Sequence, residues 1–213
     1  MILYKPTDGD VQLTKIEYRP NTCFIMTQIG KPVPVNIQNI RSKLTKYLKK
    51  IKMNQLDAGD IVTGKDFLLK IWKVIVSVPL GIAIIDENMS PNTLCNIFYE
   101  IGIMQSLGKE TVVIKTEKAN VPSDFVRTEY IKYDKDFNKN LKKYFSTYSE
   151  LAKYYETFAD QLDRNPLLAI DYIRRAYLIN GESRLKEKAK KIHRDASIGG
   201  RAMNSVEQLL VDF

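Results

Sequence analysis

Apolar runs and helical repeats alternate along the first two thirds of the chain. Short apolar runs, typical of buried strands, cover residues 22–30, 80–86, 110–116 and 129–134. Between them, residues 35–51 repeat apolar side chains at the helical period, and residues 66–78 and 92–109 also favour helices. Near the start of the chain, the Asp8-Gly9 pair predicts a hairpin or an edge strand.

Strands that alternate with helices predict a parallel sheet with helices on both faces, which is a flavodoxin-like α/β fold. In such sheets, ligands bind beyond the carboxyl ends of the strands, where the strand order switches. Two loops follow predicted strands at that edge, TQIGKPVP (residues 27–34) and DENMSPNT (residues 86–93). We therefore expect a binding site between these two loops.

After residue 135 only helical patterns remain. Apolar and aromatic side chains recur every three or four residues from Phe137 to Leu162, which predicts one long amphipathic helix. Asn165-Pro166 ends it and starts a second helix, which Gly181 closes. These patterns divide the chain into an α/β domain, residues 1–135, and a helical C-terminal region, residues 136–213.

The helical C-terminal region carries an aromatic stripe and no residues that point to chemistry. The stripe consists of Tyr144, Tyr148, Tyr155 and Phe158. We expect these helices to mediate self-association or to bind a protein partner.

The composition of the chain indicates its cellular compartment and restricts the classes of partner. No apolar run reaches the roughly 18 residues that a membrane span needs, and the start of the chain lacks a signal-peptide pattern. Cys23 and Cys95 both lie in apolar stretches, where we expect buried thiols rather than a disulfide. These features favour a cytoplasmic protein without a membrane partner.

The net charge of +8 raises the question of a nucleic-acid partner. The densest basic groups, residues 43–52 and 184–194, have helical spacing, which is typical of solvated helix faces or of a surface that attracts phosphate. The sequence has no zinc-ligand spacing, helix-turn-helix signature or alternation of basic and aromatic residues. We therefore expect neither a bound metal nor a nucleic-acid partner.

One acidic side chain, Glu100, lies in the otherwise apolar helix predicted for residues 92–109. Asn96 is four residues before it and shares its face, and Asn92 extends the row. The neighbouring stripe is apolar (Ile97, Ile101 and Met104). A carboxylate at the border of a buried stripe is partly desolvated, which costs free energy unless it is paired or used. Glu100 is thus either a structural carboxylate with a cationic or backbone partner, or a catalytic residue.

The segment SPNTLCNIFYEIGIMQSLGKETVVI, residues 90–114, resembles part of the bacterial TIR-like nucleotide-binding domains and the nucleoside 2-deoxyribosyltransferases. In those families an Asn-Val-x-x-Glu-Leu-Gly-like helix follows a strand that ends in Asp, and a Leu-Gly-Lys turn leads into the next strand. The positions that match are Asp86, Asn96, Ile97, Glu100, Ile101, Gly102, Gly108 and Lys109. VPSDFVRTEYIKY, residues 121–133, resembles a Pro-x-Asp-plus-strand stretch of TIR-like proteins, so the resemblance covers residues 20–135.

The resemblance implies cleavage or transfer at an N-glycosidic bond, with Glu100 as the catalytic carboxylate. Such a carboxylate stabilises the positive charge that builds on the sugar. Nicotinamide leaves NAD as a neutral base without a general acid, whereas a base that leaves a deoxynucleoside usually needs a proton donor. We therefore expect NAD as a substrate, not as a cofactor, in an enzyme of antiviral defence, as many TIR-like proteins are. A nucleotide-sensing or scaffolding module and a deoxyribosyltransferase remain open alternatives.

Four residues near the second loop have two possible roles each. Asp86 binds ribose hydroxyls or caps its loop. Asn96 orients Glu100 or the ribose, or makes a helix-start bond. Ser90 and Asn92 touch ribose or phosphate, or simply begin the helix.

The first loop offers a weaker phosphate site. Thr27, Gln28 and Gly30 line it, and glycine lets the backbone approach a phosphate. The loop has fewer glycines than true dinucleotide-binding loops. Lys65 and Asp66 either reach the ligand or form a helix-start turn.

Overall fold

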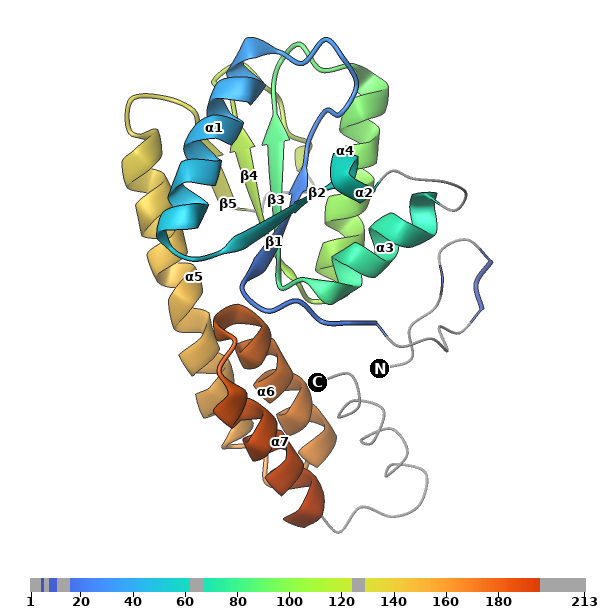
Figure 1. Cartoon of the computed structure of the whole chain (residues 1–213), viewed down its shortest axis with the longest axis vertical. Helices are drawn as coiled ribbons and strands as arrows, with labels where there is room; N and C mark the ends of the chain where they lie inside the picture. Colours follow the sequence, from blue (N-terminus) through green and yellow to red (C-terminus); the bar gives the residue numbers. More distant parts are fainter. Residues whose placement is uncertain (1–4, 6–7, 11–15, 62–66, 124–128, 196–213) are drawn as a thin grey trace. The chain divides into compact units, whose positions relative to one another are not determined.

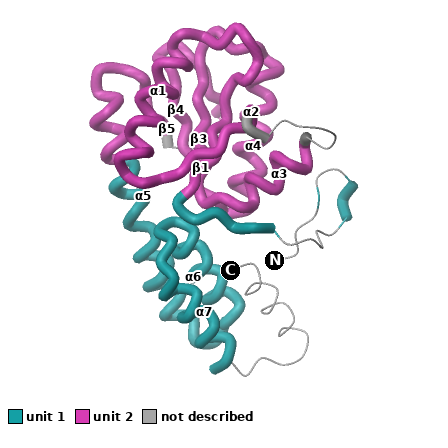
Figure 2. The backbone as a smooth tube through the Cα atoms, in the orientation of Figure 1, with its two compact units in different colours: residues 1–21, 144–213 teal, residues 22–143 magenta. Residues whose placement is uncertain are grey.

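The computed structural model describes residues 5, 8–10, 16–61, 67–123 and 129–195 (Figure 1). The chain forms two compact units (Figure 2). Residues 22–143 form one, here called the α/β unit, and residues 1–21 together with 144–213 form the other, here called the helical unit. Lys65, Asp66, residues 124–128 within the predicted Pro-x-Asp-plus-strand stretch, and the chain beyond residue 195 lie outside the described residues.

A five-stranded parallel sheet forms the centre of the α/β unit, in the order β2-β1-β3-β4-β5. The strands are β1 (Thr22–Met26), β2 (Asn54–Asp57), β3 (Leu80–Ile85), β4 (Glu110–Lys115) and β5 (Glu129–Lys132). This arrangement confirms the predicted flavodoxin-like fold class. β1 and β3 are buried along their whole length, as continuous apolar runs in a parallel sheet require.

Helices cover both faces of the sheet. They are α1 (Val35–Lys50), the short α2 (Ala58–Ile61), α3 (Phe67–Ser77) and α4 (Pro91–Ser106). From β1 the chain crosses the sheet toward one edge to form β2, and it then crosses back toward the other edge to form β3 and β4. Right-handed crossovers therefore place α1 on one face of the sheet and α3 and α4 on the opposite face (Figure 1). The predicted period of α1 is confirmed by its buried stripe, which consists of Ile37, Ile40, Leu44 and Leu48.

Strand β2 is absent from the sequence-based prediction. Its sequence, Asn-Gln-Leu-Asp, has two exposed polar residues, and it pairs with β1 alone at the edge of the sheet. An edge strand needs no continuous apolar run, so the pattern that revealed the central strands was missing here.

Helix α5 (Phe137–Ala159) passes from the α/β unit into the helical unit, where α6 (Pro166–Asn180) and α7 (Ser183–Asp195) follow. The predicted break is confirmed: the side chain of Asn165 accepts a hydrogen bond from Leu168 N at 3.1 Å. The predicted stop is confirmed too, because Gly181 adopts φ 72°, a left-handed conformation that favours glycine.

Residues near the start of the chain pack in the helical unit. Asn21 N donates to the carbonyl of Leu178 at 2.9 Å, and Arg174 donates to the hydroxyl of Tyr18 at 2.9 Å. The predicted turn at Asp8-Gly9 is closed by Lys5 N, which donates to Asp10 O at 2.8 Å. The strands expected on either side of this turn lie outside the described residues.

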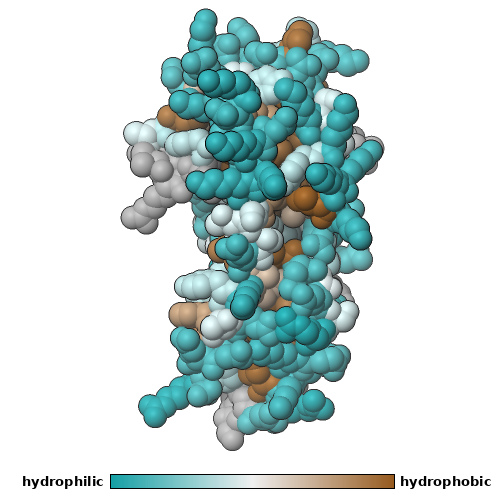
Figure 3. Space-filling model, turned by 90° about the vertical axis from the view of Figure 1, so that its left-hand side faces the viewer, coloured by the Kyte–Doolittle hydropathy of each residue, from teal (hydrophilic) through white to brown (hydrophobic). Residues whose placement is uncertain are grey.

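Hydrophilic side chains predominate on the face of the molecule in Figure 3. Among the helices that the structure describes, none combines the length and apolarity that crossing a membrane requires.

Candidate functional site

The candidate site lies at the carboxyl edge of the sheet, between β1 and β3. These strands are neighbours, but the chain leaves β1 through α1 toward β2 and leaves β3 through α4 toward β4. The two loops therefore separate at a switch in strand order, which is where open α/β sheets bind ligands. Both loops named from the sequence flank this point.

Asp86 is fully buried directly after β3. Its carboxylate accepts hydrogen bonds from Asn36 Nδ2 at 3.1 Å and from the backbone and side-chain nitrogens of Asn88, both at 2.9 Å. Asp86 thus connects the first turn of α1 to the loop after β3. These bonds serve the loop-capping role, and contact with a ribose stays a prediction.

The residues of the first loop bond mostly within the protein. Thr27 is buried, and its hydroxyl donates to the carbonyl of Ile84 at 3.2 Å, which joins the ends of β1 and β3. Gln28 donates its amide to the carbonyls of Gly30 at 3.0 Å and Pro32 at 2.8 Å, so its side chain folds the loop back on itself. Gly30 is exposed, and the space where a Cβ would lie is open.

Ser90 caps α4. Its hydroxyl oxygen accepts from Thr93 N at 3.2 Å, and Pro91 occupies the first helical position. Asn92 and Asn96 are exposed on the helix, and their side-chain amides have no hydrogen-bond partner among the described residues. Together with Glu100 they form a polar row along one side of α4.

Glu100 is half-buried, and burial raises its pKa from the ordinary value of 4.5 to about 7. Within the described part of the chain its carboxylate has neither an ion pair nor a hydrogen bond. Ile97, Ile101 and Met104 form the buried stripe beside it, as the helical spacing predicted. The cationic or backbone partner expected of a structural glutamate is therefore not present among the described residues.

The opposite side of α4 is exposed rather than buried. Tyr99 is 51% exposed, and Cys95 is exposed as well, so the prediction of two buried thiols is correct for Cys23 and wrong for Cys95. The helix packs one stripe on the sheet and turns the other side outward. The sequence did not reveal this, because apolar residues occupy both sides of the helix.

Glu100 lies over the body of the sheet rather than at its edge. From Pro91 to Glu100 the helix advances about 13 Å. One turn further on, Met104 packs over Gly81, the second residue of β3. The structure thus brings Thr27 and Asp86 together at the edge, whereas the carboxylate of Glu100 has no hydrogen bond to the side chain of either residue or to that of Asn96.

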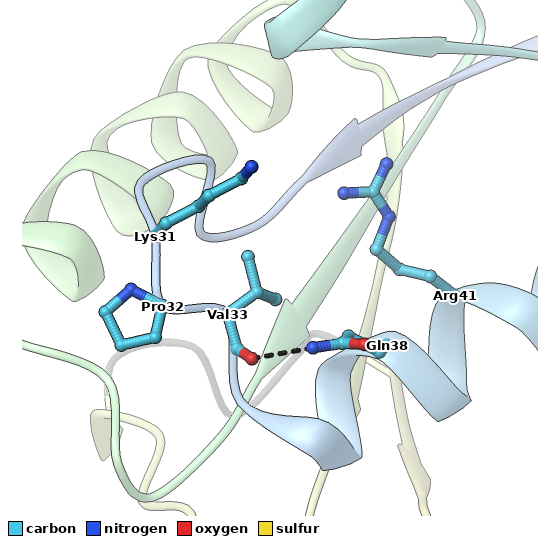
Figure 4. A pocket seen from close by; sticks show the side chains of 5 residues that line it. All are labelled: Lys31, Pro32, Val33, Gln38 and Arg41. Carbon is cyan, nitrogen blue, oxygen red and sulfur yellow. Dashed lines mark hydrogen bonds between the residues drawn. The ribbon is translucent and has the colours of Figure 1, made fainter.

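A pocket beside the first loop was missed by the sequence analysis. Its lining residues are Lys31, Pro32 and Val33 of the loop and Gln38 and Arg41 of α1 (Figure 4). Gln38 and Arg41 are three residues apart, so they share a helix face. That spacing, directly after a loop with a lysine, was the available signal.

Among the described residues, no three histidine, cysteine, aspartate or glutamate side chains are grouped so that they could hold a metal ion. Comparisons of the chain with protein-family models, with curated proteins and with solved structures found no match.

Proposed function

We propose that this protein hydrolyses the N-glycosidic bond of NAD and releases nicotinamide, with Glu100 as the catalytic carboxylate. The observation that carries the proposal is the state of Glu100, a half-buried carboxylate without a hydrogen bond or ion pair among the described residues and with a pKa raised to about 7. Perturbed carboxylates of this kind concentrate at functional sites. The resemblance of residues 90–114 to TIR-like domains supports the same assignment.

The chemistry requires little more than one carboxylate. When the bond between C1′ of the ribose and the nicotinamide nitrogen breaks, its electron pair neutralises the cationic ring and leaves positive charge on the sugar. A carboxylate in a partly desolvated position stabilises that charge more strongly than one in water. Water then adds to C1′ and releases a proton, which gives ADP-ribose.

The raised pKa is compatible with this role. A positive nicotinamide ring beside Glu100 favours the ionised form, because an opposite charge lowers the pKa of a carboxylate. Asn92 and Asn96 support the proposal, since their amides have no partner among the described residues and can bond to ribose hydroxyls. Asp86 keeps the loop at the sheet edge in place.

The setting of this activity is also a proposal. We infer a cytoplasmic enzyme of antiviral defence that works as an assembly through its helical unit. The aromatic side chains of α5 support self-association, because Tyr154 is 59% exposed and stacks on Phe158 with ring centroids 6.2 Å apart. Exposed aromatic residues are enriched in protein interfaces.

The test is to incubate the purified protein with NAD and, separately, with a panel of deoxynucleosides, and to follow products by chromatography. We expect nicotinamide with ADP-ribose or its cyclised form. Glu100→Gln should lower turnover by about a hundredfold or more, since it removes the charge and keeps the shape. Glu110→Gln is the matched control, because Glu110 is also half-buried but lies at the amino end of β4.

Three other outcomes contradict the proposal. Base exchange between deoxynucleosides without loss of NAD indicates a deoxyribosyltransferase. Tight nucleotide binding without products indicates a sensing module. NAD cleavage that Glu100→Gln leaves unchanged indicates that Glu100 is structural.

A further inference from the structure

The pocket between the first loop and α1 has a positive character. It is an open hollow of about 790 Å³, and none of its five lining residues is acidic. Figure 4 shows the side chains of Lys31 and Arg41 extending from opposite sides toward the same space. Such an arrangement favours a ligand with negative charge.

Arg41 is held in position by a carboxylate outside the lining. Its Nη2 pairs with Oδ2 of Asp57, the last residue of β2, and Asp57 Oδ1 also accepts from Gly59 N at 3.0 Å. The pair fixes one edge of the guanidinium and leaves its other N–H groups without a partner among the described residues. A guanidinium fixed in this way loses little conformational entropy when it binds an anion through those groups.

Lys31 adds an unpaired charge on the other side. Its ammonium group has no ion pair among the described residues, and the loop that carries it is fixed by the amide of Gln38, which donates to Val33 O at 2.9 Å. The start of α1 also favours an anion. Its positive helix-dipole end has no side-chain cap and no acidic residue in the first turn.

We propose that this pocket binds the diphosphate group of a nucleotide. Its volume exceeds that of a single phosphate, and two cations facing each other suit a group with charge at two phosphorus centres. The site does not include Glu100, and its ligand does not depend on cleavage of NAD. It also differs from the phosphate contacts predicted at Thr27, Gln28 and Gly30, whose polar groups bond within the protein or lack a charge.

The test is isothermal titration of the full chain with ADP, inorganic pyrophosphate and adenosine at 0.15 M salt. We expect ADP and pyrophosphate to bind and adenosine to bind at least tenfold more weakly. Lys31→Ala should weaken ADP binding by about tenfold to a hundredfold, the range expected for one charge-assisted contact. Gln38→Glu, which places a carboxylate in the pocket, should also weaken ADP binding.

Two matched variants serve as controls. Lys46→Ala removes an equal charge from the exposed side of α1, and Asn39→Asp adds an equal charge next to Gln38, and neither residue lines the pocket. Both should leave the affinity for ADP within about twofold of wild type, because exposed charges are screened at this salt concentration.

The proposal is overturned if adenosine binds as tightly as ADP or if ADP does not bind. It is also overturned if Lys46→Ala weakens ADP binding as much as Lys31→Ala does. Thermal melting of each folded variant separates lost binding from lost structure.

Discussion

Gly81 of β3 lies directly beneath Met104 of α4. A Cβ atom on Gly81 would be 2.2 Å from Met104 Sδ and 2.7 Å from Met26 Cε. The absence of a side chain at this position of a buried strand thus sets how closely α4 approaches the sheet. It therefore also sets the depth of Glu100, one turn earlier on the same helix.

Gly81→Ala should destabilise the protein by about 1 to 3 kcal/mol, the usual cost of overpacking a core. Gly102→Ala is the control on α4, because nothing lies within 4 Å of its Cβ position. There, alanine should stabilise the helix by about 0.5 to 1 kcal/mol. Urea unfolding measures both changes, and an equal effect of the two substitutions would contradict the close packing of α4.

Glu100 should make stability fall as pH rises. Its pKa is about 7 in the folded protein and 4.5 when solvated, so the folded state holds the extra proton between these values. Unfolding free energy therefore decreases from about pH 4.5 to pH 7, by up to about 3 kcal/mol, and levels off above pH 8. Urea unfolding of wild type and Glu100→Gln from pH 5 to 8 should show the difference widening with pH. A constant difference would mean that the glutamate is not desolvated.

Removing the buried carboxylate of Asp86 should lower the stability of the loop after β3. Asp86→Ala leaves three N–H donors of Asn36 and Asn88 without their acceptor, which should cost about 2 to 3 kcal/mol. Ser90→Ala, which removes only an exposed helix cap, should cost about 1 kcal/mol. Thermal unfolding compares them. Costs in the reverse order would show that Asp86 does not organise the loop.

The residues that were predicted well are those whose signal is local. Gly181 ends α6 because glycine readily adopts the left-handed conformation that closes a helix. Glu100 borders the buried stripe of α4 because helical spacing determines which face of the helix it occupies. The pocket was missed because Arg41 obtains its orientation from Asp57, on a strand with no apolar pattern. Contacts between distant segments, such as Asn21 with Leu178, leave no periodic trace in the chain.

The aromatic stripe of α5 illustrates the same limit. Tyr144 and Tyr148, two members of the stripe, are only 6% and 3% exposed, so they are not accessible to a partner. Their rings stack at a centroid distance of 6.2 Å in the interior. Spacing placed them on one face but did not say whether the protein or a partner covers it. The aromatic surface lies further along, at Tyr154 and Phe158.

Tyr154→Ser should therefore weaken self-association. Tyr154 is 59% exposed, so its loss removes apolar area from the surface and little from the core. Light scattering at several concentrations should show a lower average mass than for wild type. Tyr99→Ser, which alters a 51% exposed tyrosine of α4, should leave the mass unchanged. A wild-type monomer at every concentration would refute self-association through this surface.

The ion pairs between α5 and α7 predict how the helical unit responds to acid. Arg184 donates to both carboxylate oxygens of Glu156, at 2.6 and 2.8 Å, and Lys188 adds a third bond at 2.9 Å. Arg184 first, and then Lys188, lower the pKa of Glu156 from 4.5 to about 2. A lowered pKa stabilises the folded state above pH 4.5, and this contribution is lost as pH falls from about 4.5 to 2. Because solvent and salt screen the ion pairs, we expect them to contribute about 1 kcal/mol to the free energy of unfolding.

Circular dichroism during urea unfolding at pH 7, 4 and 3 measures this contribution. Glu156→Gln should be less stable than wild type at pH 7 and nearly equal to it at pH 3. Glu187→Gln, which alters an exposed pair with Lys190, should match wild type at every pH. A deficit of Glu156→Gln that persists at pH 3 would show that the side chain acts through packing rather than charge.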